Sequence, residues 1–166
     1  MLNKNGIPTL EDLRQVTPPQ ERLNKGPVAI AECFQCIPCN PCSTACPVHA
    51  IQVQPDINQT PVIDWDRCIG CKQCVAACPG LAIFVVDMNY SDDLATVTLP
   101  YEFLPVPEKG ACVNGLSRAG AVLGQFEVVA ARQAAGNNLT WLITLAVPKD
   151  LAMDVRNIQV GGAAHE

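Results

Sequence analysis

Short apolar runs, most of them too brief for a helix, make up the hydrophobic pattern of this chain. In the first half, each of four such runs is followed or preceded by turn-forming residues, and we expect strands there: residues 27–32, 51–54, 62–64 and 83–86. Residues 56–60, in the middle of this half, are expected to form a turn. The half therefore consists of two similar units, each with a strand, a cysteine loop, a short helical turn and a second strand.

After Met88 the pattern is rich in β-forming residues, with glycine and proline at the turns. Short runs typical of strands lie at residues 94–99, 111–114, 121–132 and 139–147. Gly124 allows a bulge in the longest of them. We expect a small β-barrel or curled sheet, closed by a helical turn at 149–156 and followed by a mobile Gly/Ala tail.

The first 25 residues are polar and are interrupted by glycine and proline. Thr9 followed by Glu11, Asp12 and Leu13 is typical of a helix start, and Thr17 before Pro18 is typical of a helix end. One short helix is therefore expected. The segment has few apolar residues with which to pack. It is expected to be an extended arm that either frays or lies on a larger partner.

These patterns divide the chain into four parts. They are an extended N-terminal arm at 1–25, a cysteine-rich domain at 26–88, a small β-rich docking domain at 89–148 and a C-terminal turn with a mobile tail at 149–166.

The cysteine-rich domain contains one motif twice. The first copy is Cys-x-x-Cys-x-x-Cys-x-x-x-Cys-Pro, with cysteines at Cys36, Cys39, Cys42 and Cys46. The second copy lies 32 positions later, with cysteines at Cys68, Cys71, Cys74 and Cys78. The same offset relates Pro47 to Pro79 and Ile51 to Ile83, which indicates an internal repeat of a whole structural unit.

The spacing of the motif favours an iron–sulfur cluster over other cysteine chemistry. Three cysteines separated by two residues wrap a loop around one cubane, and the fourth points elsewhere. Zinc prefers paired Cys-x-x-Cys knuckles separated by a spacer. Disulfides need an oxidising compartment and a geometry that adjacent Cys-x-x-Cys loops supply poorly.

Residues 26–88 resemble the bacterial-type ferredoxins that carry two [4Fe–4S] clusters. The resemblance implies an α+β fold, a ferredoxin-like dicluster domain with a pseudo-two-fold repeat, followed here by the barrel-like β-rich domain. It also implies the ligands of each cluster. Cluster I takes Cys36, Cys39, Cys42 and Cys78, and cluster II takes Cys68, Cys71, Cys74 and Cys46.

Three further residues lie outside the two motifs' ligand positions. Cys33 corresponds to Trp65 in the other copy, and we expect a buried small residue at a strand end, with a spare or alternative ligand as the second interpretation. Cys112 lies in an apolar stretch and is expected to be buried. His49, which corresponds to Leu81, is expected to be an ordinary loop histidine, with a proton-coupled role as the alternative.

The two cysteine loops differ in ways that affect reduction potential. Pro38 and Pro41 in the first loop lack the N–H groups that Gly70 and Gln73 have in the second. N–H donors that point at cluster sulfurs raise the potential, and Lys72 adds positive charge to the second loop. We therefore expect cluster I to have the lower potential.

Net charge and cysteine content limit the partners and the compartment. A formal net charge of −5 excludes the basic surface of a nucleic-acid-binding protein. Ten cysteines without an apolar N-terminal signal indicate a reducing, cytoplasmic location. The longest apolar run, residues 141–147, is too short to span a bilayer.

Residues 32–42 together with the β-rich half are similar to small iron–sulfur subunits of FAD-dependent dehydrogenases of the proline and hydroxyproline type. This resemblance implies a non-catalytic electron-transfer subunit whose partners are larger, FAD-containing oxidoreductase subunits. Two alternatives remain open: a free ferredoxin shuttle, and a redox-sensing or scaffold protein with structural clusters. A stand-alone enzyme is disfavoured because the eight cysteines leave no cluster iron open to a substrate.

Overall fold

The computed structural model describes residues 5–136 and 138–161, which form a mostly antiparallel β structure with few helices. Its elements are α1 (Leu10–Val16), α2 (Gln20–Leu23), β1 (Val28–Ala31), α3 (Pro41–Thr44), β2 (Ile51–Gln52), β3 (Val62–Ile63), α4 (Gln73–Ala77), β4 (Ile83–Asp87), β5 (Leu94–Tyr101), β6 (Cys112–Leu116), β7 (Val122–Gln133), β8 (Trp141–Pro148), the 3₁₀ turn η1 (Lys149–Leu151) and β9 (Asn157–Gln159). None of the helices in these residues is long and apolar enough to cross a membrane.

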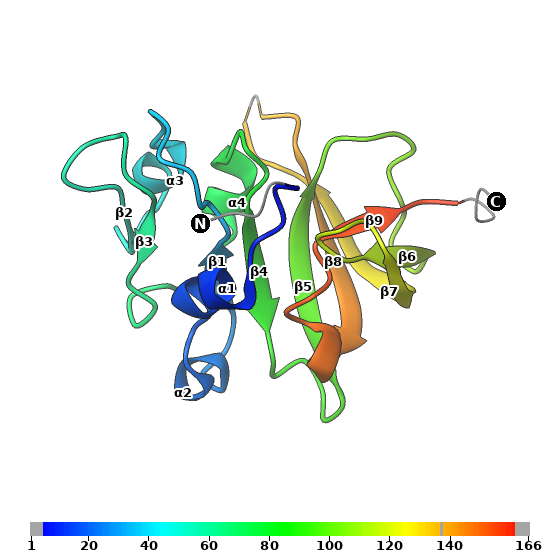
Figure 1. The fold of residues 1–166 in the computed structure, drawn as a ribbon. Helices are drawn as coiled ribbons and strands as arrows, with labels where there is room; N and C mark the ends of the chain where they lie inside the picture. Colours follow the sequence, from blue (N-terminus) through cyan, green and yellow to red (C-terminus); the bar gives the residue numbers. More distant parts are fainter. Residues whose placement is uncertain (1–4, 137, 162–166) are drawn as a thin grey trace.

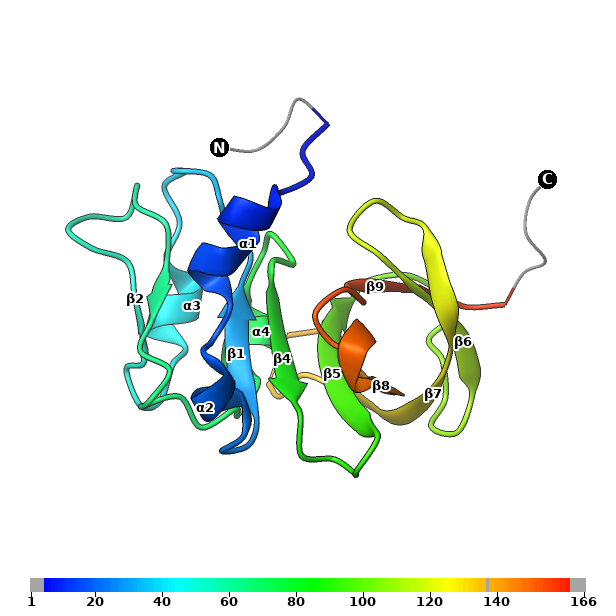
Figure 2. The same cartoon turned by 60° about the horizontal axis from the view of Figure 1, so that its bottom comes forward.

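Seven strands form one antiparallel sheet in the order β1-β4-β5-β8-β7-β6-β9, and β2 pairs with β3 in a small second sheet. Figure 1 shows α3, β2 and β3 on one side of β1 and β4, and the longer strands on the other. Figure 2 shows that the sheet curves from β5 round to β9, with η1 near its opening. The sheet crosses the expected domain boundary after Met88 through the pairing of β4 with β5.

Strands β1 and β4 separate two hydrophobic cores. Ile30, Phe84 and Val86 belong to the core of the long strands. Their neighbours Ala31 and Val85 belong to the core that also contains cluster cysteines. A strand buried on both faces needs apolar residues at successive positions, which explains the unbroken apolar runs of β1 and β4.

The expected strands all form, and the structure adds one that the pattern did not indicate. The bulge expected at Gly124 is present as a register shift, because Gly115 pairs with Gly124 while Leu116 pairs with Val122. The additional strand, β9, pairs with β6 at the edge of the sheet. It is three residues long, and too short to carry a period of its own.

The expectation of an extended N-terminal arm is wrong for residues 5–25, the part of the arm that the structure describes. The predicted helix forms as α1, with Thr9 and Asp12 in a reciprocal capping box. A second helix, α2, follows, and its Arg22 and Leu23 are buried against the cysteine-rich half. The segment therefore packs on its own chain through contacts that are distant in sequence. Most of the expected C-terminal tail lies outside the described residues.

Candidate metal centres

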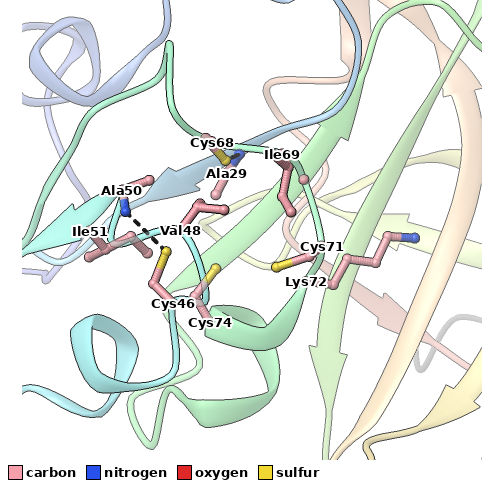
Figure 3. A pocket seen from close by; sticks show the side chains of 11 residues that line it. Ala29, Cys46, Val48, Ala50, Ile51, Cys68, Ile69, Cys71, Lys72 and Cys74 are labelled. Atoms are coloured by element: carbon pink, nitrogen blue, oxygen red, sulfur yellow. Dashed lines mark hydrogen bonds between the residues drawn. The ribbon is translucent and has the colours of Figure 1, made fainter.

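The second predicted ligand set lines one cavity. Cys46, Cys68, Cys71 and Cys74 surround it together with Ala29, Val48, Ala50 and Ile51 among others. Figure 3 shows the four sulfur atoms directed toward a common space between the cysteine loop, α4 and β1. We call this space the cluster II cavity.

The backbone of the second loop takes two left-handed conformations that bring these sulfurs together. Gly70 has φ +64°, and a Cβ added there would lie 2.6 Å from the Pro27 Cβ atom. Lys72, the residue before α4, has φ +71°. Glycine adopts this conformation without steric cost, so the loop turns tightly between Cys68 and Cys71.

Backbone N–H groups donate to cysteine sulfurs around this cavity. The Ala50 N–H donates to the Cys46 Sγ at 3.2 Å, and the Ala29 N–H donates to the Cys68 Sγ at 3.4 Å. Such donors stabilise thiolate sulfur and tune the potential of a bound cluster.

Arg22 forms hydrogen bonds with the backbone around the second loop, a role that was not predicted from the sequence. Its guanidinium donates to the backbone carbonyls of Trp65, Gly26, Pro27 and Cys68, at distances from 2.5 to 3.1 Å. The side chain is 7% exposed. Arg22 therefore places a buried positive charge next to a predicted cluster ligand. Its contacts with Trp65 and Cys68 span more than 40 positions, and no local sequence pattern predicts contacts at that separation.

The first predicted ligand set is only partly brought together. Cys39, Cys42 and Cys78 line a second cavity, which we call the cluster I cavity. Cys36 is exposed and does not line it. Cys33 lines it instead, half-buried just after β1. Cys33 is therefore half-buried rather than buried as expected, and its place in the lining favours the second interpretation, a spare or alternative ligand.

Several features of the two cysteine loops recur 32 positions apart. His49 and Leu81 both have φ near +50°. Ala50 donates to the Cys46 sulfur, and Ala82 donates to the Cys78 sulfur at 3.4 Å. The pairing of Ile51 with Ile63 corresponds to the pairing of Ile83 with Ala31.

Burial makes two of the predicted ligand thiols, Cys42 and Cys74, hard to ionise on their own. It raises the pKa of the Cys42 thiol to about 11, with a smaller rise from nearby cysteines. It likewise raises the pKa of the Cys74 thiol to about 12. Buried thiols of this kind lose their protons when a metal neutralises the thiolates, so the positions of Cys42 and Cys74 fit an iron–sulfur group.

None of the ten cysteines forms a disulfide bond. Within residues 5–136 and 138–161, no three His, Cys, Asp or Glu side chains gather closely enough to bind a single metal ion. In the cluster II cavity the sulfurs stand around a shared space instead, as the larger iron–sulfur cubane requires.

Glu32 begins the first cysteine loop and ties it to the β-rich half. The Arg118 guanidinium donates to both carboxylate oxygens of Glu32, at 2.6 and 2.7 Å, and the Arg156 Nε donates at 2.6 Å. Arg156 also lies over the Phe84 ring, 4.9 Å from its centroid. Desolvation raises the pKa of the Glu32 carboxyl, but Arg118 and Arg156 together outweigh it and hold that pKa below its usual value.

Two further residues that the sequence singled out lie outside both cavities. Cys112 is exposed, so the expected burial is wrong: it is the first residue of β6, and its neighbour Val113 points into the core. His49 is an exposed loop residue whose N–H donates to the Cys46 carbonyl at 3.1 Å.

Two family models match the chain. Residues 35–82 match the model of a 4Fe-4S dicluster domain, and residues 62–109 match the model of a 4Fe-4S single cluster domain. The first match spans both copies of the cysteine motif, and the second spans the later copy and continues through β5. No curated protein and no solved structure shows a significant match.

Proposed function

This chain is a ferredoxin-type iron–sulfur protein that carries two [4Fe–4S] clusters, and on that premise we propose that it is a fixed electron-transfer subunit of a multi-subunit oxidoreductase. Each cluster supplies a one-electron couple when bound. The proposed donor is a flavin-containing dehydrogenase subunit, from which this chain accepts electrons one at a time. The chain has no catalytic residues of its own in this proposal.

The observation that carries the electron-transfer role is the cluster II cavity. Four thiols from both copies of the motif line it, its other walls are largely apolar, and two N–H groups donate to its sulfurs. We propose Cys46, Cys68, Cys71 and Cys74 as the ligands of cluster II. For cluster I we propose Cys39, Cys42 and Cys78, with a fourth thiolate from the segment 33–36, which holds both Cys33 and Cys36.

We further propose that the cysteine-rich half has pseudo-two-fold symmetry. The matched conformations of His49 and Leu81 support it, as do the matched N–H···S hydrogen bonds of Ala50 and Ala82. An exchanged pair of backbone hydrogen bonds also supports it: the Asp64 N–H donates to the Ala50 carbonyl, and the Glu32 N–H donates to the Ala82 carbonyl.

The β-rich half is proposed to be a barrel-like docking domain. The curvature of its strands and its separate hydrophobic core support this role. Phe103, Leu104 and Leu139 are 59%, 87% and 73% exposed. We propose that they form one apolar patch, carried by the loop after β5 and the loop before β8. Thr140 donates to the Glu102 carboxylate, which links the two loops that carry the patch.

The same patch lies next to the cysteine-rich half. The Asn138 side chain, beside Leu139, donates to the Ala76 carbonyl of α4 at 2.6 Å. Figure 1 shows both patch loops at the end of the sheet where α4 lies. An exposed apolar surface beside an electron-transfer centre is typical of a protein–protein contact. We propose the flavin subunit as its occupant.

The test is an anaerobic affinity purification of the tagged chain from its native cell. We expect larger chains and stoichiometric flavin absorbance to co-purify with the iron. The double variant Leu104→Ser, Leu139→Ser should lose the flavin chain while keeping its iron. Tyr90→Ser is the matched control, because Tyr90 is a half-exposed aromatic residue in the turn at the opposite end of β5.

Two results would contradict the proposal. A native chain that purifies alone, as a brown monomer, indicates a free shuttle or a redox sensor. Equal recovery of flavin with the double variant and with Tyr90→Ser excludes the patch as the contact surface.

A further inference from the structure

The two cavities share part of their lining through the repeat. Six residues of the cluster II lining have counterparts 32 positions away in the cluster I lining; the matched pairs are Ala29 and Pro61, Cys46 and Cys78, Ile51 and Ile83, Ile69 and Ile37, Cys71 and Cys39, and Cys74 and Cys42. Cys68 is the cysteine that breaks the correspondence. Its counterpart Cys36 is absent from the cluster I cavity, and Cys33 lines the cavity in its place.

The backbone explains why Cys36 turns outward. Gly70, with φ +64°, makes the tight turn after Cys68, and the corresponding residue in the first loop is Pro38. Proline holds φ near −65°, so the first loop cannot follow the same path. The loops also differ two residues later, where Lys72 has φ +71° and Asn40 has φ −147°.

The lack of a hydrogen-bond donor to Cys36 also favours its outward position. The Ala29 N–H donates to the Cys68 sulfur, and the residue that corresponds to Ala29 is Pro61, which has no N–H to offer Cys36. The first loop therefore leaves the sulfur of Cys36 without the N–H donor that Cys68 has in Ala29.

We propose that Cys33, rather than Cys36, supplies the fourth thiolate of cluster I. This inference rests on the proposed dicluster function. Binding replaces the thiol proton of Cys33 with a sulfur–iron bond, and the proton passes to solvent. Cys36 is then a free, exposed thiol at the edge of the cluster I cavity, which also makes it accessible to alkylation.

The first experiment uses the native, cluster-loaded chain and needs no variant. It is treated anaerobically with iodoacetamide, and the modified cysteines are mapped by peptide mass spectrometry. We expect alkylation at Cys36 and at the exposed Cys112, which is the internal control, with Cys33 protected. Alkylation at Cys33 with Cys36 protected overturns the proposal.

The second experiment compares Cys33→Ser with Cys36→Ser by iron analysis and by EPR of the reduced protein. We expect about eight irons per chain in Cys36→Ser and about four in Cys33→Ser, with one cluster signal lost. Loss of a cluster in Cys36→Ser, or retention of both clusters in Cys33→Ser, overturns the proposal. A native chain with fewer than about eight irons contradicts the dicluster function itself, which separates the two failures.

Discussion

At the scale of single residues, Glu32 links the two halves of the molecule through ion pairs. Its carboxylate is almost buried and accepts from Arg118 and Arg156, of which Arg156 is itself buried. Removing one partner of a buried ion pair leaves the other charge uncompensated in a low-dielectric environment. The stability of the contact between the two halves therefore depends on this one carboxylate.

Glu32→Gln should lower the free energy of unfolding by about 3–5 kcal/mol, because Arg156 is left buried without its anion. Urea unfolding of the loaded chain, followed by circular dichroism, measures the change. Glu108→Gln is the control, since Glu108 is exposed, and it should change stability by less than about 0.5 kcal/mol. A similar loss in both variants would contradict the role of the network.

The same contact predicts a pH dependence of defined sign. The folded-state pKa of Glu32 lies below the ordinary value of 4.5, so its stabilisation is complete above that value and is lost as pH falls through the lower folded pKa. The stability difference between the native chain and Glu32→Gln should be constant from pH 7 to about 5 and shrink below about 4.5. A difference that grows on acidification would contradict this sign.

Arg22 is the second residue whose role is electrostatic. Its buried guanidinium donates to the Cys68 carbonyl at 2.7 Å. Arg22→Gln removes a positive charge near cluster II, and we expect the potential of that cluster to fall by on the order of 50 mV. An EPR-monitored redox titration measures the shift. Arg14→Gln, on an exposed face of α1, is the control that should leave both potentials unchanged.

At the scale of elements, the two cysteine loops carry the same cysteine spacing on different backbones. Gly70 allows the second loop its tight turn against Pro27, whereas Pro38 directs the first loop along another path. The short helices that follow, α3 and α4, nevertheless place Cys42 and Cys74 in equivalent buried positions. The difference between the clusters therefore lies in the loops rather than in the helices.

Gly70→Ala should selectively weaken cluster II. The new Cβ would lie 2.6 Å from the Pro27 Cβ, and alanine at φ +64° adds backbone strain of about 1–3 kcal/mol. Iron content and EPR should show reduced occupancy of one cluster. Gly80→Ala is the matched control, because its nearest atom, the Cys78 Sγ, is 4.0 Å away. Equal occupancy in the two variants would contradict the argument.

At the scale of the whole molecule, the two hydrophobic cores depend differently on the clusters. The core of the cysteine-rich half includes Cys42, Cys46 and Cys74, whereas the core of the long strands contains no cysteine. Removing the iron leaves protonated thiols in the first core in place of iron–sulfur bonds. This core is small and buries little apolar surface, so it depends on the clusters for its stability.

Cluster removal should therefore loosen the molecule unevenly. After chelation of the iron, we expect amides of α3, α4 and the cysteine loops to lose protection in hydrogen exchange, while β5 and β8 stay protected. Loss of protection in β5 and β8 to the same extent would show that the sheet depends on the clusters too.

The two clusters should also differ in potential, with cluster II the higher. The Ala29 N–H donates to the Cys68 sulfur of cluster II, whereas Pro61, the corresponding residue at cluster I, has no N–H. Arg22 and Lys72 also place positive charge near cluster II, which stabilises its reduced form. Redox titrations of Cys42→Ser, which retains cluster II, and Cys74→Ser, which retains cluster I, measure the order. A higher potential for the cluster in Cys74→Ser would contradict the expected order of the two potentials.

The sequence by itself determined the chemistry of the cysteines and most of the strands. Motif spacing and its repeat after 32 positions are covalent facts, and short apolar runs report local burial, so both are readable without a fold. The capped helix after Thr9 was predictable for the same reason, since a capping box involves neighbours along the chain.

Only the tertiary structure decided which groups meet over long distances. The contacts of Arg22 with Cys68 and of Glu32 with Arg156 join segments whose sequences carry no mutual signal. Whether Cys33 or Cys36 lines the cluster I cavity depends on Pro38 and on Pro61, which the fold brings to that cavity from another strand connection. Spacing states how many thiols are near one another, but the path of the backbone in space decides which of them converge.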